Sequence, residues 1–219
     1  MMSVMGVAGW VAFEGQRLIH ADALSLGARK QVGLWASGAE APPAAPAWDE
    51  AHEALQAALA VTPDNPGLQE QLGDLHAVAG RRDWAEQALR AGHFGNAVSA
   101  YRKAIALRPT DSRTWAGLAA AHQGLGETGP PMQQAWKRAL QLGPNEGHVQ
   151  PMLLEMALAT WTTATPQMQD WVSRFFDDGS ESQRKALNLL ADRHGLQFEP
   201  SAPGAAAPSV EKPRGTPPI

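Results

Sequence analysis

The sequence predicts an all-α protein built from repeated pairs of short helices, and two observations support this prediction. Three amphipathic segments of the same type each end at a proline, at Pro63, Pro109 and Pro144. No stretch alternates apolar and polar residues over the length of a strand, so no substantial β-sheet is expected. Proline has no backbone N–H and clashes with the preceding helical turn, so each of these prolines ends a helix.

The three segments share a pattern of large and small residues. In each, a large residue is followed three positions later by alanine and five positions after that by proline; the large residues are Leu55, Tyr101 and Trp136, and the alanines are Ala58, Ala104 and Ala139. A second pattern, W-x2-L-[GA]-x2-[Y/H], occurs at Trp115, Leu118, Ala119 and His122, and again without its tryptophan at Leu72, Gly73 and His76. Together the two patterns are typical of a tetratricopeptide repeat, in which small residues let helices approach and large residues fill the space between them.

The intervals between the prolines fit this repeat. Pro109 and Pro144 lie 35 residues apart, close to the repeat length of about 34. Pro63 and Pro109 lie 46 apart, and we place the surplus of about twelve residues, roughly three helical turns, after Gly80. The insertion would lengthen a helix or add a short one. The segment 92–97 then reads as the turn between the two helices of a repeat.

Start and stop signals mark the other helices. Asn65-Pro66 and Thr165-Pro166 each place a capping side chain before a proline at the first helical position. Ser180 and Gln183 have the spacing of a capping box, and Gly195 closes the last helix. We therefore expect a short tetratricopeptide-like solenoid whose C-terminal capping helices lie between His148 and His194. The residues expected to seal that end are Met152, Leu153, Met156, Leu187 and Leu190.

Composition divides the chain into four parts. Residues 1–37 form an apolar and then amphipathic N-terminal segment, and residues 38–47, rich in alanine and proline, form a linker. The helical domain occupies residues 48–195. Residues 196–219 are rich in proline and alanine and lack the apolar surface to offset the entropy of ordering, so we expect them to be disordered.

The N-terminal segment leaves three alternatives open. The first thirteen residues carry no charge, but Glu14 and Arg17 follow, whereas a spanning helix needs about 20 apolar residues. The segment also lacks the basic start and cleavage site of a signal peptide. It is either an anchor in the membrane interface, a span shortened by a misplaced start codon, or a helix that docks on the domain.

Composition and motifs argue against several functions. The net charge of −4 without a basic cluster argues against nucleic-acid binding, and the absence of cysteine excludes disulfides and thiolate metal or redox sites. The seven histidines are scattered, Asp177-Asp178 suits a helix start, and no phosphate loop or nucleophile elbow occurs. We therefore expect no catalytic residue, no cofactor and no metal. Trp115 and Trp136 fit core positions, whereas Trp84, Trp161 and Trp171 are freer to contact a ligand.

The repeat geometry suggests a binding surface. In such solenoids the first helix of each pair lines the concave face. The residues of those helices that avoid the packing pattern are Glu70, Asp74, Arg113, Ala116, Ala120 and Gln123. They predict a modestly polar groove suited to a peptide segment or helix of a protein partner. For any one of them, an ordinary solvated position is an equally open interpretation.

Six tracts lie between Trp48 and Trp161, over about half the length of the chain: Thr62-Pro-Asp-Asn-Pro66, Leu72-Gly-Asp-Leu75, Ala106-Leu-Arg-Pro-Thr110, Thr114-Trp-Ala-Gly-Leu-Ala119, Arg138-Ala-Leu-Gln-Leu-Gly-Pro144 and the tract from Val149 to Trp161. A resemblance to the VpsP-type polysaccharide biosynthesis proteins of bacteria rests on these tracts. It implies degenerate tetratricopeptide repeats, a membrane-proximal N-terminus and no catalytic residues. The family usually begins with a complete membrane span, which this sequence replaces by a shorter apolar segment ending before Glu14.

Two functions follow as expectations. The first is a non-enzymatic scaffold for exopolysaccharide biosynthesis or export, associated with the inner membrane through residues 1–20 and with its repeats in the periplasm. The alternative is a general repeat adaptor of another envelope or secretion complex, soluble or cytoplasmic. An enzyme of polysaccharide metabolism would need converging carboxylates, and the acidic residues Asp49, Glu50, Glu53, Glu70 and Asp74 show no such pattern.

Overall fold

A computed structural model of the chain describes residues 4–82, 86–198 and 210–211. Within these residues the protein forms nine α-helices and one pair of two-residue strands, so the all-α prediction is confirmed. The helices are α1 (Val4–Ala36), α2 (Ala45–Val61), α3 (Pro66–Gly80), α4 (Gln87–Leu107), α5 (Ser112–Gly124), α6 (Pro130–Leu142), α7 (Val149–Ala159), α8 (Pro166–Asp177) and α9 (Glu181–Asp192). The strands β1 (Gln197–Phe198) and β2 (Val210–Glu211) pair antiparallel.

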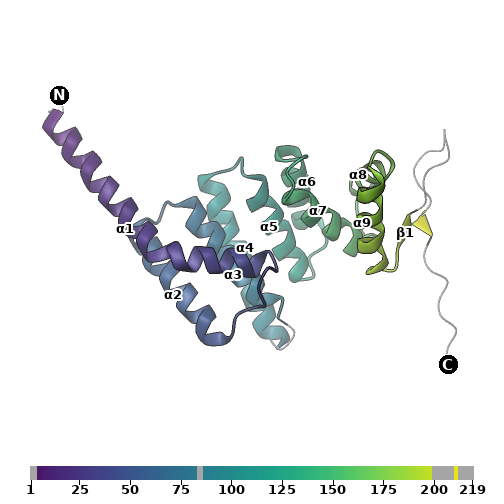
Figure 1. Ribbon diagram of the computed structural model, residues 1–219, viewed down its shortest axis with the longest axis horizontal. Coiled ribbons are helices and arrows are strands. Elements are labelled where there is room, and N and C mark those ends of the chain that lie inside the picture. Colours follow the sequence, from purple (N-terminus) through teal and green to yellow (C-terminus); the bar gives the residue numbers. More distant parts are fainter. Residues whose placement is uncertain (1–3, 83–85, 199–209, 212–219) are drawn as a thin grey trace.

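The helices follow one another along an elongated body, from α1 at one end to α9 and β1 at the other (Figure 1). Each helix packs against its successor in the chain as far as α9. Additional contacts join α1 to α3, α3 to α5 and α5 to α7. The N-terminal part of α1 extends beyond this body (Figure 1).

The helix boundaries agree with the local signals. Helices α2, α4 and α6 end two residues before Pro63, Pro109 and Pro144. Three further start signals are confirmed by hydrogen bonds at the helix N-termini: Asn65 accepts from the N–H groups of Gly67 and Leu68, Thr165 accepts from Met168, and Ser180 and Gln183 form a reciprocal capping box. Gly195 follows α9 with a φ of 66°, a conformation that glycine adopts without strain. Local chemistry therefore sets where these helices begin and end.

Residues 87–92 of the predicted insertion lengthen α4, which runs for 21 residues. The predicted turn at residues 92–97 is wrong, since this segment lies inside α4. Phe94 explains the difference, because its buried ring packs against Gly80 of α3 and Gly124 of α5. A Cβ atom at Gly124 would lie only 2.4 Å from that ring, so the ring occupies space that the two glycines leave open.

The buried apolar residues form two clusters. The smaller one joins α1, α2 and α3, and Val32 and Trp35 of α1 pack there with Leu55 of α2. From Ala21 onward the N-terminal segment thus packs on the folded body, as the docking alternative predicted, although the division at residue 37 set it apart from the domain. The predicted linker at 38–47 is also shorter, because α2 already begins at Ala45. Pro46 in the first turn of α2 explains this, since proline suits the start of a helix.

The larger cluster extends from α3 to β1. The residues predicted to seal the C-terminal end all pack in it: Leu153, Met156 and Leu187 are buried, and Met152 and Leu190 are partly buried. Trp136 is also buried, and its Nε1 donates to the carbonyl of Leu153 at 2.9 Å. Trp161 and Trp171 are half-buried against the aromatic rings of Phe198 and Trp136, and Trp84 lies outside the described residues.

The beginning of the predicted disordered tail is part of this core. Leu196 and Phe198 are buried, and the Phe198 ring lies 5.3 Å from Trp161 and 5.8 Å from Phe176 between centroids. Residues 210–211 pair with 197–198 as the second strand. The prediction of disorder is therefore wrong for residues 196–198, whose two large apolar side chains offset the cost of ordering. Residues 199–209 and 212–219 lie outside the described part of the chain.

Candidate functional site

The residues predicted to line a groove lie in three different environments. Glu70 and Asp74 of α3 are buried, and Arg113 of α5 is partly exposed beside them. Ala116 is fully buried in the larger core cluster, so it is not available to a partner. Ala120 and Gln123 are half-buried. The structure thus brings together three of the six residues, and these three contact one another.

A network of charged and polar groups holds these three residues. Arg113 bonds to Asp74 through Nη2 at 2.7 Å and approaches Glu70 through Nε at 3.4 Å. The Tyr101 hydroxyl of α4 donates to the other Asp74 oxygen at 2.7 Å. Arg108, just after α4, pairs with Glu70 at 2.9 Å and also with Asp111. The network therefore links α3, α4 and the start of α5.

Burial shifts the ionisation of this network. Desolvation raises the pKa of Asp74 above its usual 3.8, and the Arg113 charge and the Tyr101 hydrogen bond partly oppose this. Desolvation and the neighbouring Asp74 likewise raise the pKa of Glu70 above 4.5. The pKa of Tyr101 lies well above 10, because its ring is buried beside these carboxylates. These groups satisfy one another, so the arrangement suits the joining of helices and leaves no open carboxylate for acid–base chemistry.

Three histidines that looked scattered in the sequence meet beside Trp48. His76 of α3 and His93 of α4 approach with Nδ1 atoms 3.3 Å apart. His52 stacks on the Trp48 ring with centroids 4.9 Å apart, and its ring lies 5.5 Å from that of His76. The Trp48 indole N–H donates to the carbonyl of Leu75 at 3.2 Å. We call Trp48, His52, His76 and His93 the imidazole cluster.

Sequence reasoning missed this cluster because its members lie on three helices. The only local signal was the spacing of four between Trp48 and His52, which places both on one face of α2. The pairing of His76 with His93 depends on how α3 packs on α4. The cluster borders a pocket of about 400 Å³ between α2, α3 and α4.

His76 and His93 of the imidazole cluster both have a pKa below the usual 6.5. Burial, and then the neighbouring imidazoles His52 and His93, lower the pKa of His76 from 6.5 to about 4. Below pH 6.5 the His76 imidazole of the unfolded chain binds a proton, whereas the folded chain keeps it neutral until about pH 4. The contribution of His76 to the free energy of unfolding is therefore complete above pH 6.5 and is lost as the pH falls towards 4. An NMR titration, with the His76 signal identified through a His76→Gln variant, should give a midpoint near 4. A midpoint near 6.5 would contradict the packing described.

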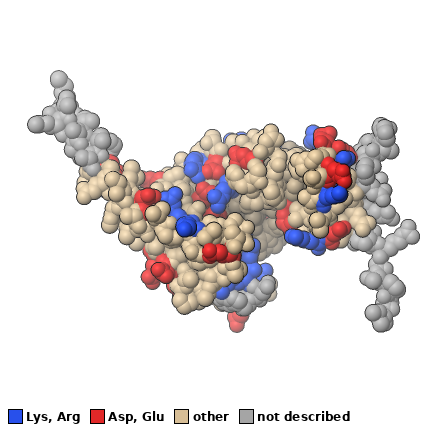
Figure 2. Space-filling view, viewed as in Figure 1, with Lys and Arg blue, Asp and Glu red and all other residues tan. Residues whose placement is uncertain are grey.

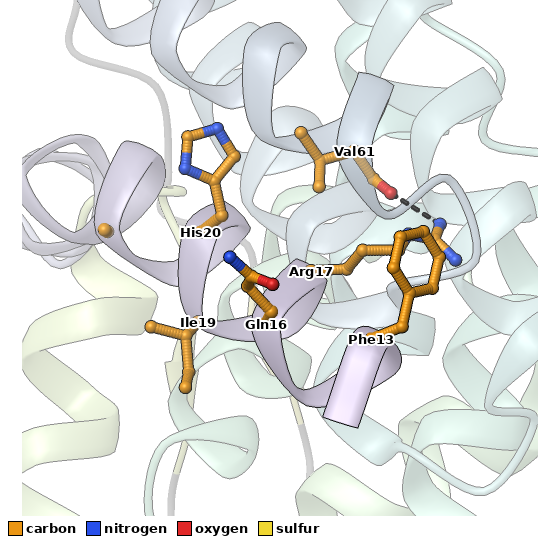
Figure 3. A pocket seen from close by; sticks show the side chains of 7 residues that line it. Phe13, Gln16, Arg17, Ile19, His20 and Val61 are labelled. Atoms are coloured by element: carbon orange, nitrogen blue, oxygen red, sulfur yellow. Dashed lines mark hydrogen bonds between the residues drawn. The ribbon is translucent and has the colours of Figure 1, made fainter. Parts of the chain in front are cut away.

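A second hollow lies on α1, where it is open to solvent. It has a volume of about 530 Å³ and is lined by Phe13, Gln16, Arg17, Ile19, His20, Ala23 and Val61. Figure 3 shows the Arg17 side chain reaching the end of α2, where its Nη2 donates to the Val61 carbonyl at 2.7 Å. The side chains of Phe13, Ile19 and Leu26 are 60%, 73% and 62% exposed. We call the exposed side chains of Ile19, Ala23 and Leu26 the α1 surface.

The α1 surface lies opposite the face that packs on the body. The buried positions of α1 are Ala21, Ser25, Ala28, Val32 and Trp35, which recur every three or four residues on one side of the helix. Ile19, Ala23 and Leu26 lie on the other side and are exposed. Charges of both signs are intermingled on the face shown in Figure 2. The α1 surface is therefore an apolar area that the rest of the described chain does not cover.

The described residues contain neither a metal site nor a membrane-spanning helix. Among the described residues, no group of three or more His, Cys, Asp or Glu side chains is arranged to hold a metal ion. Within the same part of the chain, no helix combines the length and apolar character needed to cross a membrane. A comparison with known protein families and a search of the curated proteins found no match.

Proposed function

We propose that this protein is a non-enzymatic tetratricopeptide-like scaffold that binds protein partners in exopolysaccharide biosynthesis or export at the bacterial inner membrane. The order of helix contacts supports the repeat part of this proposal, because each helix packs on its successor and α3, α5 and α7 pack in series. The repeat positions also support it. Tyr101 and Trp136 are buried, as are the small residues Ala58, Ala104 and Ala139.

The exposed α1 surface is the observation that best supports the binding of a protein partner. Folded proteins bury most large apolar side chains, and a contiguous apolar area left open is typical of an interaction site. Ile19 and Leu26 are more than half exposed on one face of a helix whose other face is packed. A partner helix or strand that covered them would gain the free energy of removing this area from water.

The polysaccharide context rests on the resemblance of residues 48–161 to the VpsP-type proteins. Under this proposal residues 1–20 associate with the inner membrane and the repeats lie in the periplasm. The competing proposal is a soluble adaptor of another envelope or secretion complex, with the same α1 surface and a cytoplasmic location. The identity of the captured partner and the cell fraction that yields it separate the two.

The test is affinity capture from detergent-solubilised host membranes and, in parallel, from the soluble fraction, with quantitative mass spectrometry. The bait carries Ile19→Glu and Leu26→Glu, which place charges on the α1 surface. The control bait carries Leu189→Glu on α9, where the side chain is similarly exposed at 67%. We expect at least about a tenfold loss of partner in the first bait, since covering an apolar side chain is worth about 1.5 kcal/mol or more. The control should capture the partner as the unchanged protein does.

The outcomes distinguish the two proposals. Glycosyltransferase or polysaccharide-export components, captured from membranes through the α1 surface, would support the exopolysaccharide scaffold. Partners unrelated to polysaccharide, captured only from the soluble fraction, would support the adaptor instead. Equal capture by both altered baits would show that α1 does not form the binding surface.

A further inference from the structure

The pocket beside the imidazole cluster is lined by imidazoles and amide side chains and by the cation of Lys103. Its lining includes His52 of α2, His76 of α3, and His93 and Lys103 of α4. No carboxylate of the described residues lines it. Glu70 and Asp74 belong to the same helix as His76, but they bond to Arg113 and Tyr101 in the network on the other side of α3. The pocket therefore favours a negatively charged ligand.

Gln69 favours a ligand that carries a hydrogen-bond donor. This side chain lines the pocket, is only 9% exposed, and its Oε1 atom is buried without a hydrogen-bond partner. A buried acceptor left in this state costs free energy that a ligand N–H would recover. The ligand thus presents an anionic group for the cations and an N–H for Gln69. An acidic residue of a peptide has both, in its side-chain carboxylate and its backbone amide.

We propose that this pocket binds a carboxylate side chain of an acidic peptide segment and takes up a proton on an imidazole as it does so. This inference deepens the proposed function and rests on it, since the segment belongs to the protein partner. The pocket volume of about 400 Å³ lies within the range of about 300–1,000 Å³ usual for small-ligand sites.

The proton uptake follows from the groups that surround the imidazoles. His76 faces His52 and His93, and His93 faces His52 and Arg82 from the segment after α3. Burial first, and then these neighbours, lower the pKa of His76 and of His93, so both imidazoles are largely neutral at pH 7. A bound carboxylate supplies the missing negative charge and raises the pKa of His93, which lines the same pocket. Binding and protonation therefore strengthen each other.

A divalent metal ion fits the pocket less well. The spacing of 3.3 Å between His76 Nδ1 and His93 Nδ1 suits two imidazole ligands, but Lys103 lines the same pocket and Arg82 acts on His93. These cations repel a metal ion, and no carboxylate of the described lining offsets them. Metal binding is accordingly an outcome that the test must separate from peptide binding.

The test is isothermal titration calorimetry of the full chain with an acetylated dipeptide of two glutamates and its dipeptide counterpart of two glutamines. We expect the glutamate dipeptide alone to bind, with affinity rising about tenfold per proton taken up between pH 7 and pH 6. Titration in buffers of different ionisation enthalpy should show the uptake of a proton. Lys103→Gln should lower the affinity about tenfold, since it removes a charged hydrogen-bond donor.

The control is Arg102→Gln, which removes the same charge from the adjacent position of α4 and should leave the affinity unchanged. His93→Gln, checked for an unchanged melting temperature, should abolish the rise in affinity at low pH. Binding of Zn²⁺ or Ni²⁺ without the glutamate dipeptide, no binding of the dipeptide, or equal losses in Lys103→Gln and Arg102→Gln would overturn the inference. Partner capture through α1 does not use this pocket, so the proposed function stands or fails separately.

Discussion

Replacement of Arg113 by methionine is expected to lower the free energy of unfolding by about 2 kcal/mol, less than for a fully buried ion pair because the Arg113 side chain is 39% exposed to solvent. Arg113 pairs with the buried carboxylates of Asp74 and Glu70. Methionine keeps much of the side-chain volume but leaves both carboxylates without this cation. Arg108 still pairs with Glu70, so the larger loss arises at Asp74.

This loss should depend on pH. Without Arg113 the pKa of Asp74 rises further, because Arg113 is the largest influence that lowers it. The loss is therefore largest at pH 7 and shrinks as the pH falls through the folded-state pKa values of Asp74 and Glu70, where protonation removes the unpaired charges. Urea unfolding followed by circular dichroism at several pH values measures this. Arg138→Met on the exposed side of α6 is the control, and a loss independent of pH would count against the buried-charge explanation.

Replacement of Gly117 by alanine is expected to destabilise the fold by about 2 kcal/mol, within the range for overpacking a core. Alanine normally stabilises a helix by about 1 kcal/mol relative to glycine, so the expected sign is opposite to that of helix propensity. A Cβ atom at Gly117 would lie 2.6 Å from Cζ of Tyr101. A Cβ atom at Gly73 of α3 would likewise lie 2.7 Å from Cε1 of this ring. The ring is therefore held between the two glycines and cannot move away towards α3.

Gly95→Ala provides the matched control for this substitution. Gly95 is exposed inside α4, and a Cβ atom there would meet nothing within 4 Å. It should raise the melting temperature, whereas Gly117→Ala should lower it, and thermal unfolding followed by circular dichroism compares them directly. A rise in both variants would mean that Tyr101 is not held between the two glycines.

The helix boundaries were largely predictable because their causes are local. Pro63, Pro109 and Pro144 stop helices through the geometry of their own rings, and Asn65 caps α3 through atoms two and three residues away. The segment 92–97 was predicted as a turn because of its glycines, but tertiary packing of Phe94 between α3 and α5 outweighed that preference. Similarly, Phe198 packs against the rings of Trp161, between α7 and α8, and Phe176 of α8. The composition of the tail does not reveal these contacts.

The candidate sites were likewise only partly predictable from the sequence. The repeat pattern selected Glu70, Asp74 and Arg113 as one surface, and the structure does bring them together. Helical periodicity alone, however, did not reveal that Tyr101 and Arg108 would engage two of them from another part of the chain, or that Ala116 would be buried. The imidazole cluster was not predicted, because nothing in the sequence around one histidine indicates which other histidines it contacts in the fold.

The sequence by itself determined that the protein is all-α, where most of its helices begin and end, and which positions in them are large or small. These properties depend on backbone sterics and on hydrogen bonds within a few residues. Only the tertiary structure decided that α1 would expose Ile19 and Leu26, that three histidines would gather around Trp48, and that Glu70 and Asp74 would be buried. Such features depend on which helix faces meet, and packing between residues distant in the chain settles this.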